Sequence, residues 1–318
     1  MKRVAFFLAL MVLTSLARAQ GYPAKLVRVI VTFPPGGTPD IYGRVMAAEL
    51  QKLWGQGVVV ENRTGAGGTI GTDAVAKAAP DGYTLLFAAD ATLTLAPAVI
   101  AKLPYDPQRD FAPIVNVTTG PFVLLAHPSF PASSVPELLA LAKAQPGKIP
   151  YASSGAGTQQ HLAMETVKTM GGVDLLHIPY KGFGQGIADV LAGQVPMIFG
   201  GITASISLIR GGKVKGIAVT SPRRARALPD LPAFAETLPG FDIQAWYGFL
   251  APAATPREIV RKINADAISI IQRPDFLERL ARDGIEPVGN TPEEFAAQIR
   301  ADIERWARLA KASGARAE

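Results

Sequence analysis

The chain has 318 residues, 48% of them hydrophobic and 18% charged, with a formal net charge of +6 and no cysteine. This length allows a sizeable core and favours two domains or lobes. Without cysteine there is no disulfide framework, so burial must hold the fold together. The charge is mild and forms no Lys/Arg block, which argues against nucleic acid as a partner.

Residues 1–19 have the pattern of a secretory signal peptide. Lys2 and Arg3 supply a positive n-region, residues 4–16 an apolar stretch, and residues 17–19 a small-x-small cleavage site. The apolar stretch is shorter than the roughly 20 residues that span a bilayer. We therefore expect cleavage after this segment, export to the periplasm, and a mature chain with a formal charge of +3.

Strand-like and helix-like segments alternate from the start of the mature chain. Runs of β-branched residues predict strands, and Thr38 before Pro39 has the pattern of an N-cap. The expected strands are Leu26–Phe33, Val58–Glu61 and Tyr83–Ala88, and the expected helices are Thr38–Leu53 and Thr69–Ala78.

The same alternation continues after residue 113. Further strands are expected at Ile114–Thr118, Phe122–Ala126, Ile149–Ala152, Asp174–Ile178, Met197–Phe199 and Ile217–Thr220. N-cap, Pro, Glu patterns at Ser134–Glu137, Thr255–Glu258 and Thr291–Glu294 predict helix starts. Strands that alternate with helices indicate βαβ units and mainly parallel sheets.

Two segments suit a chain that crosses between lobes, Thr118–Pro121 and Phe241–Trp246. With two crossings, residues 20–120 and 246–318 form one lobe and residues 121–245 form the other. The sequence therefore predicts an α/β protein of two lobes.

Three glycine-rich turns each follow an expected strand and precede an expected helix: Phe33–Asp40, Gly65–Gly71 and Ser153–Thr158. Glycine lets backbone N–H groups converge, and a helix N-terminus adds unpaired donors. Such turns suit a carboxylate or phosphate. A nucleotide is disfavoured because no lysine follows in a Walker register, and Ile70 and Gln160 stand where a dinucleotide motif needs glycine.

The sequence contains few residues that could support catalysis. Ser153, Ser154 and His161 lie close together and could form a nucleophile pair, but no G-x-S-x-G motif surrounds them. The histidines at 127, 161 and 177 are scattered and have no metal-binding spacing. We expect no enzyme, no metal and no cofactor, and keep a periplasmic hydrolase that uses Ser154 and His161 as the alternative.

Several polar and aromatic residues near expected loop ends allow two interpretations. Lys181 either pairs with a ligand carboxylate or is a solvated lysine. Asp40 can accept N–H bonds within its own turn and fix the loop. Trp246 and Tyr247 either pack at the crossing point, which we favour, or stack on an aromatic ligand.

In these motifs the chain closely resembles the Bug family, the periplasmic substrate-binding proteins of tripartite tricarboxylate transporters. The resemblance covers nearly the whole mature chain. The matching stretches are Val31–Asp40, Val58–Gly71, Ala79–Leu86, Pro104–Ile114, Tyr151–Ala163, His177–Gly182, Ala218–Ser221 and Trp246–Pro256.

The resemblance implies a two-lobed periplasmic-binding-protein-like fold of type II, which closes like a Venus flytrap on a small organic carboxylate. The ligand would be a di- or tricarboxylic, an amino-acid or an aromatic acid, held mainly by backbone N–H and hydroxyl hydrogen bonds. It also implies delivery to a membrane permease, and we expect a monomer. A carboxylate sensor of the same fold is the alternative to transport. By position in the family motifs, the ligand contacts would be Gly37, Thr38, Asp40, Ala89, Asp90, Thr92, Ser154, Gly155, Gly157, Thr158, Tyr180 and Gly200.

Two departures from the family pattern bear on the ligand. The family often has hydroxyl residues where this chain has Ala89-Asp90-Ala91, and Asp or Asn after the phenylalanine of Phe199-Gly200-Gly201. An ionised Asp90 would repel a carboxylate or pair with an amino group. The two glycines would enlarge the pocket. The resemblance places the first and third glycine turns on opposite lobes and leaves Gly65–Gly71 as structural support.

Overall fold

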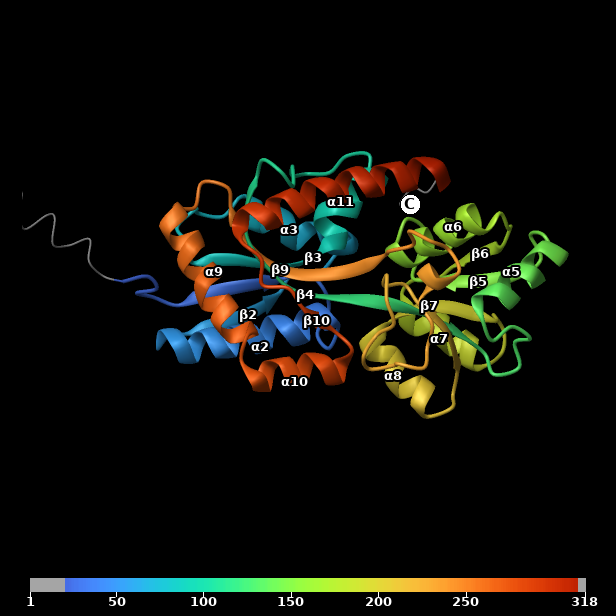
Figure 1. The fold of residues 1–318 in the computed structure, drawn as a ribbon. Helices are drawn as coiled ribbons and strands as arrows, with labels where there is room; N and C mark the ends of the chain where they lie inside the picture. The colour runs from blue at the N-terminus through green and yellow to red at the C-terminus, as the bar shows by residue number, and fades with distance from the viewer. Residues whose placement is uncertain (1–20, 314–318) are drawn as a thin grey trace, which may run out of the picture.

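The computed structural model describes residues 21–313, so the expected signal peptide at residues 1–19 lies outside the described residues. Strands and helices alternate as predicted and form two lobes (Figure 1). The strands are β1 (Val27–Val31), β2 (Val58–Asn62), β3 (Thr84–Ala89), β4 (Phe111–Ala126), β5 (Pro150–Ser153), β6 (Leu176–Pro179), β7 (Met197–Gly201), β8 (Lys215–Val219), β9 (Gln244–Pro252) and β10 (Glu286–Pro287).

The helices flank the strands on both sides of each lobe (Figure 1). They are α2 (Thr38–Trp54), α3 (Thr69–Ala76), α4 (Ala96–Val99), α5 (Val135–Ala144), α6 (Gln159–Gly171), α7 (Phe183–Leu191), α8 (Ile202–Arg210), α9 (Arg257–Ile271), α10 (Pro274–Asp283) and α11 (Pro292–Ser313). Short helical turns lie at η1 (Ala66–Gly68), η2 (Ala91–Leu95) and η3 (Phe234–Glu236).

The strands follow the order β2-β1-β3-β9-β4-β7-β5-β6, with β8 and β10 also paired to β4. We call the part around β1–β3 the first lobe and the part around β5–β7 the second lobe. Within each of these groups the strands are parallel. The sheet as a whole is mixed rather than mainly parallel, because β4 carries the chain out of the first lobe, β9 brings it back, and both pair antiparallel with their neighbours.

The two strands expected at 114–118 and 122–126 are one continuous strand, β4, of 16 residues. Gly120 and Pro121 do not interrupt it, because they pair with Ala245 and Gln244 of β9. The segment predicted as a crossing point is thus part of an extended strand, and β4 and β9 run side by side between the lobes (Figure 1). The sequence did not predict β9, β10 or α10.

Two of the expected N-caps differ from the structure. Helix α2 has Gly37 and not Thr38 at its N-cap, and Thr38 lies beside Tyr247 of β9. Helix α9 has Pro256 and not Thr255 at its N-cap. The capping residue expected for α5 is confirmed, because Ser134 Oγ accepts a hydrogen bond from the Glu137 N–H at 3.3 Å.

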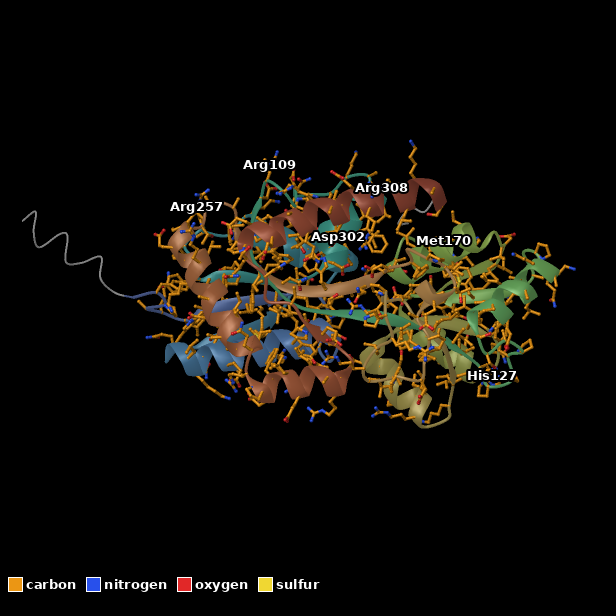
Figure 2. The ribbon with its side chains drawn as sticks, in the orientation of Figure 1. Arg109, His127, Met170, Arg257, Asp302 and Arg308 are labelled. Carbon is orange, nitrogen blue, oxygen red and sulfur yellow. The ribbon has the colours of Figure 1, made fainter. Side chains whose placement is uncertain are left out.

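The C-terminal helix α11 extends from the first lobe onto the second (Figure 1). Phe295 and Ile299 pack in a cluster of the first lobe, and Trp306 and Ala310 in the main cluster of the second. Figure 2 shows Asp302 on the inner side of this helix, where it accepts a hydrogen bond from the indole N–H of Trp246 in β9 at 3.0 Å. Helix α11 therefore joins both lobes to the strand between them.

Candidate ligand-binding site

The two lobes meet where β3 ends and α6 begins. Asp90 directly follows β3, and its Oδ2 accepts a hydrogen bond from Gln159 Nε2 at 2.5 Å. Gln159 is the first residue of α6, immediately after the third glycine turn. This bond brings a predicted contact of the first lobe next to the predicted loop of the second. In open α/β sheets, ligands bind at such carboxyl ends of strands.

The first glycine turn is held by the carboxylate of Asp40. Its Oδ2 accepts the Gly36 N–H at 3.0 Å, and its Oδ1 accepts from Arg44 at 3.0 Å and Asn62 at 2.8 Å. Burial opposes ionisation, but these hydrogen bonds together keep the pKa of Asp40 below its usual value. Oδ2 is thus engaged inside the turn and Oδ1 by α2 and the end of β2, which fits the interpretation that Asp40 fixes the loop.

Gly37 and Thr38 begin α2, whose first turn offers N–H groups without intrahelical partners. Gly37 has a φ of −76°, and a Cβ there would make only ordinary contacts. The residue of this turn that needs a left-handed backbone is Gly36, with a φ of +86°. Thr38 lies beside Tyr247, whose pKa is raised by burial and then by the neighbouring Asp90.

The third glycine turn uses three of its N–H groups internally, among them that of Thr158, which donates to the Gly155 carbonyl at 3.4 Å. Gly155 N–H donates to Ser153 Oγ at 3.1 Å, and Gly157 N–H donates to His161 Nδ1 at 3.1 Å. Thr158 caps α6 by accepting the His161 N–H at 3.4 Å, and its own hydroxyl donates to the Gly155 carbonyl at 2.8 Å. The hydrogen bonds of the turn leave out the N–H and the hydroxyl of Ser154.

Three buried oxygens at strand ends have no hydrogen-bond partner among the described residues: Thr32 Oγ1 after β1, Asp90 Oδ1 after β3 and Ser154 Oγ after β5. Buried polar atoms in folded proteins are almost always paired. Three unpaired atoms, each just beyond the carboxyl end of a strand, are therefore a candidate set of ligand contacts.

The second glycine turn packs behind this set. Gly68 has a φ of +94°, and a Cβ there would lie 2.7 Å from Thr92 Cγ2 and 3.1 Å from Thr32 Oγ1. The Thr92 hydroxyl donates to the Ala89 carbonyl at 3.0 Å. The turn therefore lies close against the 89–92 loop, which suits the supporting role expected for it.

Asp90 is fully buried, and its charge state decides what it can bind. Burial, and then the nearby Asp302, raise the pKa of Asp90 to about 8, against the opposing effects of Arg305, Gln159 and the backbone N–H of Ala91. Asp90 is therefore mainly a neutral acid at pH 7. The repulsion of a carboxylate expected from the sequence assumes an ionised Asp90, which this environment disfavours.

Tyr180 and Gly200 complete the predicted contacts in the second lobe. The Tyr180 hydroxyl donates to Asp189 Oδ2 at 2.7 Å, and its carbonyl oxygen would lie 3.3 Å from a Cβ on Gly155. The expectation that Gly200 and Gly201 enlarge the pocket is contradicted at Gly200, whereas a Cβ on Gly201 would have nothing within 4 Å. A Cβ on Gly200 would lie 2.8 Å from the ring of Phe183, so Phe183 already fills that space.

The histidines predicted as scattered are in part brought together. The rings of His161 and His177 stack at 3.9 Å between centroids, and Ser153 Oγ lies 2.6 Å from His177 Nε2. Ser154 makes no bond to His161, whose Nδ1 accepts from Gly157, so the nucleophile pair of the hydrolase alternative is not formed. Burial lowers the pKa of both histidines, to about 4 for His177, and they act as neutral supports of the turn.

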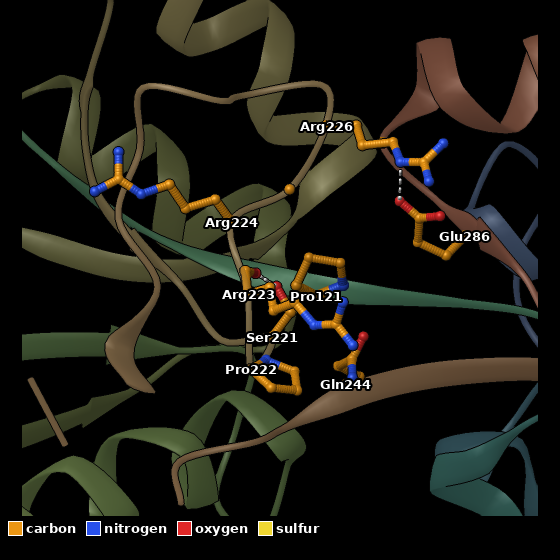
Figure 3. A pocket seen from close by; sticks show the side chains of 10 residues that line it. Pro121, Ser221, Pro222, Arg223, Arg224, Arg226, Gln244 and Glu286 are labelled. Carbon is orange, nitrogen blue, oxygen red and sulfur yellow. Dashed lines mark hydrogen bonds and ion pairs between the residues drawn. The ribbon is translucent and has the colours of Figure 1, made fainter. Parts of the chain in front are cut away.

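Within residues 21–313, no group of three or more His, Cys, Asp or Glu side chains is arranged to hold a metal ion. A cavity of about 300 Å³ lies where β4 and β9 cross between the lobes (Figure 3). Its wall includes Gln244, Arg223 and the ion pair of Arg226 with Glu286 at 3.8 Å. None of the predicted contacts lines this cavity.

Thr32 and Gln159 were not predicted as site residues, and for Tyr247 packing was favoured over ligand contact. Gln159 and Thr32 border predicted glycine turns, so their positions could have been noted. Tyr247 lies in β9 and reaches Thr38 only through tertiary structure.

A family model described as the tripartite tricarboxylate transporter family receptor, TctC, matches residues 42–315. The chain belongs to this receptor family. The expected kinship with Bug proteins is confirmed by BugT of Bordetella pertussis, which is 36% identical over 315 residues, 98% of this chain and 97% of the relative. A UPF0065 protein from the tcbD-tcbE intergenic region of a Pseudomonas species is 38% identical over 313 residues, 97% of this chain and 93% of the relative.

Solved structures of TctC-like receptors have the same fold. An R. palustris protein with adipate superposes with a TM-score of 0.85 at 33% identity, over 93% of this chain and 99% of that one. MatC from Rhodopseudomonas palustris with bound malate superposes with a TM-score of 0.79 at 33% identity, over 91% of this chain and 99% of that one. The periplasmic binding protein BugD superposes with a TM-score of 0.81 at 36% identity, over 93% of this chain and 100% of that one.

These receptors are solute-binding proteins and not enzymes, and two of them carry dicarboxylates. Across the described part of this chain, no helix has the length and apolar character needed to cross a membrane. The fold class expected from the sequence, a two-lobed periplasmic-binding-protein-like fold, is confirmed.

Proposed function

We propose that this chain is a periplasmic receptor that binds a small organic carboxylate between its two lobes. It delivers the ligand, as a monomer, to the permease of a tripartite tricarboxylate transporter. The lobes comprise residues 20–120 with 246–318, and residues 121–245. The expected contacts at their junction are those of the 37–40, 89–92 and 154–158 loops, with Tyr180 and Gly200.

The observation that carries this proposal is the set of unpaired buried oxygens on Thr32, Asp90 and Ser154. Two of them are hydroxyls and the third belongs to a carboxyl group that is mainly neutral at pH 7, so all three can donate to a carboxylate. Helix α2 begins in the 37–40 loop and helix α6 directly after the 154–158 loop. The partial positive charge at these two helix N-termini favours an anion.

The ligands named for related structures support a dicarboxylate as the first choice. Adipate and malate both carry two carboxylates, which suits a site with donors on both lobes. A hydrolase finds no support in the site, because Ser154 lacks a base and Ser153 is fully buried.

A thermal-shift screen of the mature chain against aliphatic, hydroxylated and aromatic acids tests the proposal. A ligand at a hundredfold excess over its Kd stabilises the folded state by about 2.7 kcal/mol. We expect at least one dicarboxylate to raise the melting temperature. A panel in which no acid does so would contradict the proposal.

Substitution of Ser154 by Ala localises the site. Because Ser154 Oγ makes no hydrogen bond within residues 21–313, the variant should keep its stability while its affinity for the acid falls by about tenfold. Ser207→Ala, on the exposed surface of α8, is the matched control and should bind like the wild type.

A further inference from the structure

Among the described residues of the candidate site, Asp90 is the only acidic one with a buried oxygen that has no hydrogen-bond partner. Its side chain is fully buried at the junction of the two lobes. Gln159 donates to Oδ2, while Oδ1 has no hydrogen-bond partner among residues 21–313. The two oxygens of one carboxyl group are therefore in different situations.

Charged and titratable groups reach Asp90 from two neighbouring elements. Asp302 and Arg305 belong to α11, and Tyr247 belongs to β9. Arg305 is engaged with Asp302, since its Nη2 lies 3.1 Å from Asp302 Oδ1. Tyr247 interacts with Thr38. None of these groups forms an ion pair with Asp90, and the more distant charge of Arg305 offsets the effect of burial only in part.

The bond from Gln159 also fixes where the proton of the neutral acid resides. Oδ2 accepts the amide N–H, and in a neutral carboxylic acid the carbonyl oxygen is a better acceptor than the hydroxyl oxygen. In the neutral acid the proton is then on Oδ1, the oxygen without a partner. A buried O–H with no acceptor is unfavourable, and a ligand oxygen can remove this penalty.

The N-termini of two helices indicate whether the ligand group beside Asp90 is a carboxylate oxygen or an amino group. Gln159 is the first residue of α6, so the N-terminus of that helix lies beside Asp90. Thr38, which contacts the Asp90 neighbour Tyr247, begins α2. Both helix ends favour an anion and disfavour an ammonium group.

We propose that Asp90 is a specificity-determining residue that, as a neutral acid, donates its Oδ1–H to a carboxylate oxygen of the ligand. The inference rests on the proposed function of this site. Ligand binding then depends on the proton that Asp90 carries on Oδ1. The ligand group beside Asp90 is then a carboxylate and not an ammonium.

Calorimetric titration with adipate and malate between about pH 6 and 9.5 tests this inference. The affinity of the wild type should be constant at the acidic end and fall, by up to tenfold per pH unit, above the pKa of Asp90. Titrations in buffers of different ionisation enthalpy should show the uptake of about one proton per ligand near the alkaline end.

Asp90→Asn is the informative variant, because asparagine can accept from Gln159 through its oxygen and donate to the ligand through Nδ2 without ever ionising. It should bind within about threefold of the wild type near pH 6 and keep that affinity near pH 9.5. Asp230→Asn, at an exposed position, should retain the pH profile of the wild type.

The possible failures are distinguishable. If no acid binds the wild type at pH 6, the proposed function fails and the inference fails with it. If an acid binds but its affinity and proton uptake do not change with pH, only the inference is overturned. The same holds if aspartate or 2-aminoadipate binds more tightly than succinate or adipate, with an affinity that rises with pH. The measurements on the wild type decide the matter even if Asp90→Asn does not fold.

Discussion

Acid should weaken the fold through the stacked histidines of the second lobe, and a His177→Gln variant isolates this effect. The ring of His177 stacks on the rings of both His161 and Tyr151. Its centroid lies 3.9 Å from that of His161 and 5.0 Å from that of Tyr151. Burial, and then the neighbouring His161, lower the pKa of His177 from 6.5 to about 4. The folded protein therefore binds this proton less readily than the unfolded chain does.

The sign of the effect follows from this difference. Above pH 6.5 the histidine is neutral in both states, and its contribution to stability is fully present. As the pH falls from 6.5 toward 4, the unfolded chain takes up the proton first and the contribution is lost. For a single group with these two pKa values, the loss between pH 6.5 and 4.5 is about 2 kcal/mol.

Urea denaturation of the wild type and His177→Gln at several pH values between about 7 and 4.5 measures this loss. The variant should be less stable at neutral pH, because it loses the ring stack, but its stability should decline less on acidification, by about 2 kcal/mol. His127→Gln removes a histidine whose Nδ1 lies 2.7 Å from Ser129 Oγ, at the far edge of the second lobe (Figure 2), and should follow the wild type. Parallel pH dependences for the wild type and His177→Gln would refute the reasoning.

Two further predictions concern a glycine turn and a buried amide. Gly155→Ala should abolish or strongly weaken binding of the best dicarboxylate in calorimetry, because Gly155 has a φ of +133° that alanine rarely adopts. Gly37→Ala, where a Cβ makes only ordinary contacts, should bind normally. Equal effects of the two substitutions on the affinity would contradict this prediction. Asn264→Ala should lower the free energy of unfolding by about 2 kcal/mol in urea, because Asn264 donates to two backbone carbonyls at 2.8 and 2.9 Å, and an unchanged midpoint would count against it.

The sequence was sufficient for the local elements whose signals are themselves local. Strand β1, helix α2 and the capping residue Ser134 follow from β-branched runs and capping patterns, and the structure has them within a few residues. The α/β class follows from their alternation along the chain.

The strand between the lobes could not be predicted in the same way. Gly120 and Pro121 normally interrupt strands, and only their pairing with β9 keeps β4 continuous. That pairing joins segments more than 120 residues apart, which no local pattern encodes. The mixed character of the sheet was missed for the same reason.

The candidate site was predicted as three loops, but its chemistry depends on contacts across the fold. Asp90 is neutral because the chain buries it near Asp302, and its orientation depends on Gln159 of the other lobe. The pairing of Ser153 with His177 is similarly long-range. The positions of these residues could be read from the sequence, while their protonation and partners could not.

The central claim is that the site recognises the carboxylates of a small acid. The most direct measurement is calorimetric titration of the mature chain with adipate and malate, each compared with its uncharged diamide. The account predicts binding of one ligand per chain for at least one acid and none for its diamide. Absence of binding by both acids, or equal affinity for an acid and its diamide, would contradict it.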